Sequence, residues 1–228
     1  MTSAIITCAG NGTRFGKNKI LSRINGKTVL EMTVGQFQKS KKINEIIVVA
    51  KKHDFKIYEG ILKKRGLRAK LVEGGEERII SAYNGVRASR GEIVIVHDGV
   101  RPLTPVWLIN KVAEESKKYQ AVVPAVTPTT TIKYARKDLL IKKSLPRTET
   151  WLSQTPQGFR KKLILRAYRE AIGERCFVPT DDSELVTKLG KKVRIVQGDH
   201  YNIKITFPLD LIVAEKLIEF AKKGEESV

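Results

Sequence analysis

The sequence has few cysteines and lacks any long apolar run. Its two cysteines, Cys8 and Cys176, lie far apart and lack the spacing of a zinc site or a disulfide framework. No apolar stretch approaches the roughly 18 residues that a membrane-spanning helix needs. We also expect no signal peptide, and we therefore predict a cytoplasmic protein without a membrane span.

Histidine is scarce as well. The three histidines, His53, His97 and His200, show no metal-site spacing with one another or with the two cysteines, so we expect none of them to bind a metal. The sequence also offers no convincing arrangement of His with Ser for nucleophilic catalysis.

Acidic residues are in the minority. The 24 Asp and Glu residues compare with 43 Lys and Arg, which gives a formal net charge of +19. Such an excess suits nucleic acid, an anionic membrane or a small polyanionic substrate. The cations are scattered in pairs such as Lys41-Lys42 and Lys191-Lys192, and they form neither a block nor an aromatic-interleaved stripe. This scatter favours a solvated surface over a nucleic-acid face.

Strand-like and helix-like patterns alternate through the first half of the chain. The predicted strands span residues 3–8, 45–50, 69–73, 92–97 and 120–126. The predicted helices span residues 28–40, 54–65, 77–89 and 104–118, the last with Thr104 as N-cap before Pro105. The alternation predicts an α/β fold, with a mostly parallel sheet and helices on both faces. With 228 residues, we expect a single domain over 1–228.

The pattern changes after residue 126. Residues 127–134 and 139–145 look like two β segments around a polar turn, which predicts an inserted hairpin within an arm subdomain at 127–150. Because isolated hairpins are marginal in water, we expect a second copy of the chain to cover it. The remaining predicted elements are helices at 160–171, 181–189 and 208–223 and strands at 193–197 and 203–206.

The first predicted strand runs into a loop with three glycines, Gly10, Gly12 and Gly16. The loop lacks the Gly-Lys-Ser/Thr ending of a P-loop, and its glycine spacing differs from the dinucleotide-binding fingerprint. Glycines let a backbone turn and present N–H groups to an anion, and three cations accompany them: Arg14, Lys17 and Lys19. The loop predicts a site for a nucleoside triphosphate that is itself reacted upon.

Four further segments carry candidate chemistry. Gly74-Gly75-Glu76-Glu77-Arg78 joins a strand to a helix, and His97-Asp98-Gly99-Val100-Arg101-Pro102 ends a strand. Asp98 suits Mg²⁺, which needs one or two carboxylates plus phosphates; the alternative is an Asp98–Arg101 ion pair that steadies the turn. The other two segments are Thr155-Pro156-Gln157, preceded by Pro146-Arg147-Thr148, and Asn202-Ile203-Lys204-Ile205-Thr206. In the last of these, a lysine within a strand-like run would be costly if unpaired.

Together these segments resemble the 2-C-methyl-D-erythritol 4-phosphate cytidylyltransferases, a family within the sugar- and polyol-phosphate cytidylyltransferases. The resemblance covers the chain from about Ser3 to Leu217, with the motifs in the family's order. It implies a Rossmann-like nucleotidyltransferase fold, with the hairpin as a dimerisation arm. It also implies an enzyme that transfers CMP from CTP to methylerythritol phosphate and releases pyrophosphate, with Mg²⁺, as a homodimer.

The resemblance implies roles for individual residues. Arg14 and Lys19 would stabilise charge on the α-phosphate and the leaving pyrophosphate, while Arg147 and Lys204 would position the acceptor's phosphate. The implied substrate-binding residues are Ala9, Gly10, Gly12, Gly75, Glu76, Ser81, Asp98, Gly99, Arg101, Thr131 and Thr155, with Asp98 near the metal. Because the glycine loop is shorter than in many members, Lys17 competes with Lys19 for the triphosphate, and the following Ile-Leu-Ser favours Lys19.

Electrostatic repulsion between the two anionic substrates also calls for two sets of cations, one set for each substrate. A phosphate monoester is already ionised at neutral pH, so it needs no general base, but it must approach another anion. Positive charge on both sides reduces that repulsion.

The sequence leaves three alternatives to this function: a ribitol-5-phosphate cytidylyltransferase, a basic nucleic-acid-binding α/β protein and a non-catalytic homologue.

Overall fold

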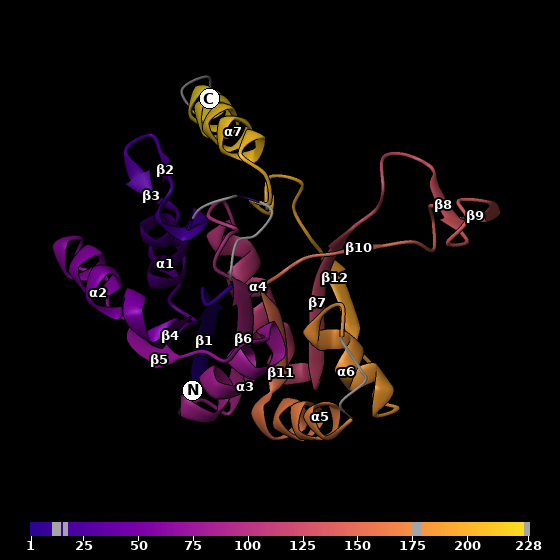
Figure 1. Cartoon of the computed structure of the whole chain (residues 1–228), viewed down its shortest axis with the longest axis horizontal. Helices are drawn as coiled ribbons and strands as arrows, with labels where there is room; N and C mark the ends of the chain where they lie inside the picture. The colour runs from indigo at the N-terminus through magenta and orange to yellow at the C-terminus, as the bar shows by residue number, and fades with distance from the viewer. Residues whose placement is uncertain (11–14, 16–17, 175–178, 226–228) are drawn as a thin grey trace.

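A mostly parallel sheet forms the centre of the protein, and helices cover both of its faces (Figure 1). The computed structural model describes residues 1–10, 15, 18–174 and 179–225. The first-half strands of the main sheet are β1 (Thr2–Thr7), β4 (Glu45–Ala50), β5 (Lys70–Glu73), β6 (Ile93–Asp98) and β7 (Ala121–Val126). The main helices between them are α1 (Val29–Lys39), α2 (Phe55–Lys64), α3 (Arg78–Ala88) and α4 (Val106–Lys118). The α/β prediction is confirmed.

The strand order brings the amino-terminal strand to the middle of the sheet. With β10 at Leu152–Ser153 and β11 at Gln157–Arg160, the order is β10-β7-β11-β6-β1-β4-β5, and β12 (Arg194–Gln197) also pairs with β7. Strand β1 runs parallel to both β4 and β6, so their carboxyl ends reach the same edge. Ligands of open α/β sheets bind at such an edge.

Two short strands interrupt the parallel arrangement. Strand β11 (Gln157–Arg160) lies antiparallel between β6 and β7, and β10 (Leu152–Ser153) pairs antiparallel with β7. A small hairpin of β2 (Arg23–Ile24) and β3 (Lys27–Thr28) precedes α1. The sequence analysis predicted none of these four strands.

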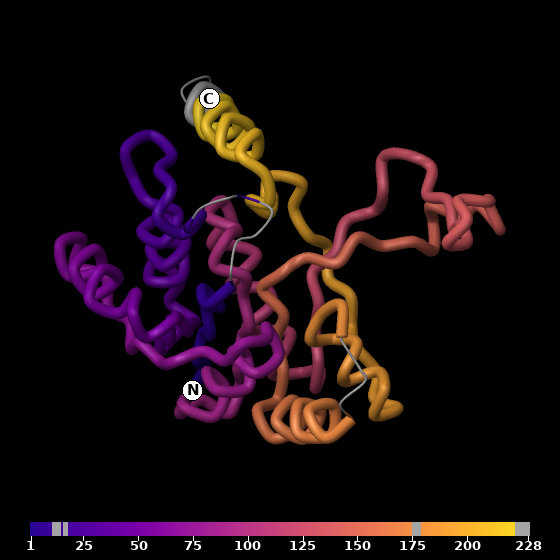
Figure 2. The backbone as a smooth tube through the Cα atoms, viewed as in Figure 1, coloured from indigo at the N-terminus to yellow at the C-terminus, as the bar shows by residue number. Residues whose placement is uncertain are grey.

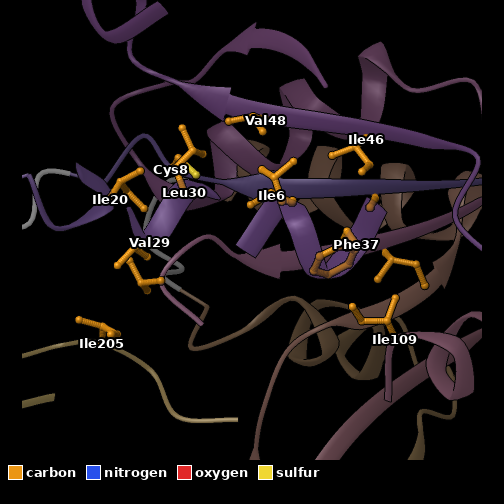
Figure 3. Close-up of a cluster of buried hydrophobic side chains, with 14 of the residues drawn as sticks. Ile6, Cys8, Ile20, Val29, Leu30, Phe37, Ile46, Val48, Ile109 and Ile205 are labelled. Carbon is orange, nitrogen blue, oxygen red and sulfur yellow. The ribbon is translucent and has the colours of Figure 1, made fainter. Parts of the chain in front are cut away.

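Each face of the sheet has its own core because successive strand residues point to opposite sides. Ala4 and Ile6 of β1 pack with residues of α1, α2 and α4, and Figure 3 shows part of this cluster, including Ile6, Phe37 and Ile109. Ile5 packs on the other face with residues of α3, α5 (Lys161–Gly173) and α6 (Asp182–Lys188). Cys8 extends the first cluster and contributes apolar packing, whereas Cys176 lies outside the described residues.

The arm stands away from the sheet. Strands β8 (Ile132–Ala135) and β9 (Ile141–Leu145) form a separate two-stranded antiparallel hairpin, as predicted. The backbone trace leaves the body after β7, runs out to this hairpin and returns towards β10 (Figure 2). Its tip exposes apolar side chains, with Leu139 85% exposed and Ile141 63% exposed.

Three predicted details differ from the structure. Thr104 does not cap α4, because the N-cap of that helix is Pro105. The Thr104 hydroxyl instead donates to Asn202 Oδ1 at 2.7 Å, in a buried contact that replaces the cap. Residues 203–206 form no strand, although Ile205 N donates to Val100 O at 2.9 Å. The sheet also contains the antiparallel strands above. The closing helix α7 (Leu209–Glu225), the 3-10 helix η3 (Lys52–Asp54) and the 3-10 helix η2 (Lys19–Leu21) are the remaining elements among the described residues.

Candidate active site

A pocket of about 340 Å³ opens at the carboxyl ends of β1 and β6. Its walls come from the residues after β1, from η2, from the loop before α3, from the end of β6 and from Lys204. Predicted site residues among its lining are Ala9, Gly10, Lys19, Gly75, Glu76, Ser81, Asp98 and Lys204. Residues distant in sequence therefore meet at the edge that the strand pattern indicated.

Two of the predicted residues, Gly12 and Arg14, lie outside the described residues, as does Lys17. Lys19 lines the pocket from the first position of η2. The Asn18 side chain caps this short helix by accepting a hydrogen bond from Ile20 N at 3.2 Å. Capping fixes the local backbone, so Asn18 helps to hold Lys19 at the pocket.

The loop before α3 packs too closely to accept larger residues. A Cβ at Gly74 would lie 2.8 Å from Ser81 Oγ, and a Cβ at Gly75 would overlap the side chain of Ile80. Ser81 Oγ accepts a hydrogen bond from Gly75 N at 3.1 Å. The hydroxyl thus braces the loop from within the pocket wall, which leaves the backbone of Gly75 close to the space that a ligand would occupy.

Asp98 is the focus of the pocket's charge. Its Oδ2 atom lies 2.8 Å from Lys204 Nζ and 3.7 Å from Arg101 Nε, and its Oδ1 atom lies 3.2 Å from Arg78 Nη2. Burial alone would raise the pKa of Asp98, but Arg78, Lys204 and Arg101 together hold that pKa well below its usual range. The carboxylate is therefore ionised throughout the neutral range. The Asp98–Arg101 pair is present, but it is one of three ion pairs made by this carboxylate.

Three predicted residues lie behind the pocket wall. Arg101 is 9% exposed, and its Nη1 atom donates to Asn202 O at 2.7 Å. Thr155 Oγ1 accepts from Asp98 N at 3.1 Å, so it fixes the backbone of the central acid. Gly99 packs against the end of the neighbouring strand β1. Its N–H donates to Thr7 O, and a Cβ on Gly99 would overlap Cys8 Sγ. These residues support the pocket and do not line it.

His97 belongs to the same supporting layer, which the sequence analysis did not predict. It is fully buried, with its ring 3.0 Å from Thr155 Oγ1 and 3.2 Å from Arg101 O. Burial lowers the pKa of His97 to about 3 despite the attraction of Asp98. The imidazole is therefore neutral at pH 7.

Thr131 and Arg147 lie on the arm, far along the chain from the pocket residues. Both side chains are exposed, and Arg147 Nη1 donates to Thr129 O at 3.5 Å. Neither residue lines the pocket of its own chain. The structure of one chain therefore brings Lys204, but not Arg147, to Asp98.

Arg78 is the pocket residue whose importance sequence reasoning missed. It lines the pocket and contacts both Asp98 and Asp182. The Gly-Gly-x-x-Arg spacing contained the signal, but no pattern in the sequence indicates that Asp182 lies beside it. Thr7, Cys8, Ile20, Glu77 and Val100 also line the pocket without having been predicted to do so.

Asp98 fits a magnesium ion that takes most of its ligands from elsewhere. Within the described part of the chain, no group of three His, Cys, Asp or Glu residues is arranged to hold a metal. A single ionised carboxylate is nonetheless enough for Mg²⁺ when a substrate supplies phosphate oxygens.

None of the described helices has the length and apolar character required to span a membrane.

Comparison with known proteins adds to this geometry. The model of the family described as 2-C-methyl-D-erythritol 4-phosphate cytidylyltransferase matches residues 2–219. A relative of that name from Caldanaerobacter subterraneus is 42% identical over 220 residues, which cover 93% of this chain and 96% of the relative. Another of that name from Geobacillus kaustophilus is 37% identical over 220 residues, covering 94% and 96%.

Solved structures agree with the sequence comparisons. A 4-diphosphocytidyl-2C-methyl-D-erythritol synthase from Anaerococcus prevotii superposes with a TM-score of 0.87 at 34% identity, covering 96% of both chains. A 2-C-methyl-D-erythritol 4-phosphate cytidylyltransferase from Thermus thermophilus superposes with a TM-score of 0.77 at 29% identity, covering 94% of this chain and 98% of the other.

Proposed function

The chain belongs to the 2-C-methyl-D-erythritol 4-phosphate cytidylyltransferase family, and from this premise we propose how its residues serve the reaction. The protein is a nucleotidyltransferase that transfers CMP from CTP to methylerythritol phosphate in isoprenoid precursor synthesis and releases pyrophosphate. The observation that carries the proposal is the pocket in which Lys19, Lys204 and Arg78 accompany the ionised Asp98.

The cytidine part of CTP binds against the backbone after β1 and the loop before α3. Ala9, Gly10 and Gly12 come from the first segment, and Gly75 and Glu76 come from the second. The tight packing of Gly74 and Gly75 supports this role, because it leaves no room for a Cβ at either position and Gly75 therefore meets the pocket with backbone alone. Ser81 holds that loop through Gly75 N, and discrimination of the base therefore rests mainly on backbone groups.

Arg14 and Lys19 stabilise the charge that builds on the α-phosphate and the leaving pyrophosphate. Lys19 is supported by its place in the pocket lining, whereas the role of Arg14 rests on the family resemblance. Fixed cations suit this step because phosphoryl-type transfer gives the protein little covalent work to do. The acceptor's phosphate supplies the nucleophile, and no proton needs to be removed from it at neutral pH.

Lys204 and Arg147 position the phosphate of the acceptor. Lys204 lies at the pocket beside Asp98. Arg147 and Thr131 would reach a pocket from the arm of a second copy, since both are exposed in their own chain. Arg101, Thr155 and Gly99 act from behind the wall by fixing Asp98 and the turn that follows it.

Mg²⁺ would be held by Asp98 together with phosphate oxygens of CTP. When bound, the ion would offset charge on the triphosphate and polarise its phosphorus–oxygen bonds. Lys204 Nζ contacts Asp98 Oδ2 in the structure, so Lys204 must leave this oxygen if the metal is to use it. The proposal therefore predicts weak Mg²⁺ binding without CTP.

The assembly is a homodimer formed through the arm at residues 127–145, and the location is cytoplasmic. The exposed apolar tip around Leu139, Leu140 and Ile141 supports the dimer, because a hairpin of two strands needs a further surface to cover it. The two cysteines of the sequence lack the spacing of a disulfide framework, which supports the reducing compartment. On this basis we treat the arm, residues 127–150, as a subdomain of the single domain that spans 1–228.

The test is a comparison of two acceptors. Purified protein with CTP and Mg²⁺ receives either methylerythritol phosphate or ribitol 5-phosphate, and pyrophosphate release is measured. The family match favours methylerythritol phosphate, so turnover with that acceptor is expected to exceed turnover with ribitol 5-phosphate. Turnover with ribitol 5-phosphate alone would contradict the assignment.

A further inference from the structure

An ion network between the exposed Arg78 and two buried carboxylates connects the pocket to helix α6. Arg78 is the first residue of α3, and its Nη1 and Nη2 atoms lie 3.0 Å and 2.9 Å from the two carboxylate oxygens of Asp182. The same guanidinium reaches Asp98 Oδ1 through Nε at 3.3 Å and Nη2 at 3.2 Å. Arg78 thus bridges two carboxylates on different elements.

Asp182 is itself fixed and lies outside the pocket lining. It is 1% exposed, it begins α6, and its Oδ1 atom accepts a hydrogen bond from the buried Tyr168 hydroxyl at 2.9 Å. A bidentate pair between a guanidinium and a carboxylate is directional, since two parallel N–H groups must meet two oxygens. Asp182 therefore sets the plane of the Arg78 guanidinium.

The two carboxylate oxygens of Asp98 contact different basic residues. Oδ2 is contacted by Lys204 and Arg101, and Oδ1 is contacted by Arg78. In the proposed reaction Lys204 turns to the acceptor's phosphate, so its contact with Asp98 changes during the cycle. Arg78 is held by Asp182, which lies outside the pocket lining and is not assigned to the acceptor, so this contact is available to restrain Oδ1 throughout the cycle.

We propose that Arg78, set by Asp182, is a positioning residue that orients the Asp98 carboxylate for binding of CTP with Mg²⁺. This inference rests on the proposed role of Asp98 at the metal. Asp182 would then affect nucleotide binding without touching the nucleotide. Its loss should weaken CTP binding and should leave the affinity for the acceptor largely unchanged.

The primary test replaces Asp182 by Asn, which keeps the side-chain size and removes the charge. Titration calorimetry with CTP and Mg²⁺, without acceptor, should show about tenfold weaker binding, a size typical for one broken contact in a network of ion pairs. In turnover assays the KM for CTP should rise by about the same factor, while the KM for methylerythritol phosphate stays within about twofold.

Asp181→Asn is the matched control. Asp181 caps the same helix by accepting from Glu184 N at 3.0 Å, and it contacts Ser153 and Gln157. Its side chain makes no contact with Arg78 among the described residues. The control should lose thermal stability as Asp182→Asn does, yet bind CTP with Mg²⁺ as the wild type does.

Two further variants keep the test decisive if Asp182→Asn fails to fold. Tyr168→Phe removes only the hydrogen bond onto Asp182 and should produce a smaller loss of the same kind. Arg78→Lys keeps the charge but not the two-pronged geometry, so it should weaken CTP binding.

Unchanged CTP binding in Tyr168→Phe and in Arg78→Lys, or an equal loss in Asp181→Asn, would overturn the inference. Failure of the proposed function looks different: the wild type would then bind CTP and release no pyrophosphate with methylerythritol phosphate. The calorimetric comparison would still decide the role of Asp182.

Discussion

Single residues determine where positive charge meets the two substrates. Arg14 belongs to the glycine loop of the sequence, between Gly12 and Gly16, and we assign it to the triphosphate together with Lys19. Replacing Arg14 by Ala should lower kcat by about two orders of magnitude, as the loss of one contact to developing charge typically does. Steady-state pyrophosphate release at saturating CTP measures this change.

The pattern of the kinetic constants separates two roles for Arg14. A normal kcat with a raised KM for CTP would mean that Arg14 binds the ground state and the transition state equally, contrary to the assignment. Lys17→Ala is the matched control, because it removes a neighbouring cation from the same loop. We expect the Lys17 variant to retain most of its turnover.

His97 provides a prediction about pH. Its pKa is about 3 in the folded protein against 6.5 for the free side chain, so the unfolded chain binds a proton that the folded protein excludes. This contribution to stability is fully present above about pH 6.5 and is lost as the pH falls towards 3. Between pH 7 and pH 5 it should lower the free energy of unfolding by about 2 kcal/mol.

Urea unfolding at several pH values measures the effect of His97. The His97→Gln variant should show a flatter decline between pH 7 and pH 5, because the group that titrates has been removed. His53→Gln serves as the control, since it removes an exposed histidine instead of the buried one. Identical slopes for wild type and His97→Gln would show that the buried imidazole is not responsible.

Among single residues, the sequence predicted those whose position in a strand or at its end was recognisable from neighbouring residues. Asp98 stood at a strand end and Lys204 within a strand-like run, and both line the pocket. Arg78 and His97 were missed because their importance comes from partners distant in the chain: Asp182 for Arg78, and Thr155 for His97. Arg14 and Gly12 lie outside the described residues, so their assignments remain predictions.

Elements were predictable where a regular pattern extends over a full strand or helix. Strand β4 was predicted with its observed bounds, and α1 begins after the Thr28 cap, whose side chain accepts from Glu31 N at 3.1 Å. Strands β10 and β11 have two and four residues, too few for alternation to be recognised. The wrong strand at 203–206 has another cause: its apolar residue Ile205 is buried against the body through Val100, outside any sheet.

The arm is the element whose role is most open to experiment. If Arg147 acts across the dimer, a mixed dimer of Arg147→Ala and Lys204→Ala subunits has one fully intact site. Co-expression with two different tags should yield mixed dimers with about half of the wild-type turnover, since one of two symmetric sites is complete. Each variant alone should be nearly inactive with methylerythritol phosphate.

Action within one chain gives the opposite result for the arm. Every site in a mixed dimer would then carry one defect, and turnover would stay at the level of the single variants. Arg136→Ala is a useful control, because Arg136 also lies on the arm next to β8 but was not assigned to a site. The Arg136 variant should behave as the wild type does.

The whole molecule carries a formal net charge of +19, and many of its lysines lie on the surface. We expect any binding to RNA to depend steeply on salt and to disappear near 0.2 M salt, because scattered cations supply only non-specific attraction. Fluorescence anisotropy with a labelled RNA measures this binding. The Lys204→Ala variant should bind as the wild type does, and tight binding that persists at 0.2 M salt would point to a dedicated nucleic-acid surface.

The central claim is that cations at the pocket allow two anionic substrates to react, and Lys204→Ala tests it most directly. The measurement is pyrophosphate release from CTP, Mg²⁺ and methylerythritol phosphate by the wild type and this variant, with folding checked by circular dichroism. The account predicts rapid release by the wild type and a loss of at least about 100-fold in the variant. A folded Lys204→Ala variant that keeps the wild-type turnover would contradict it.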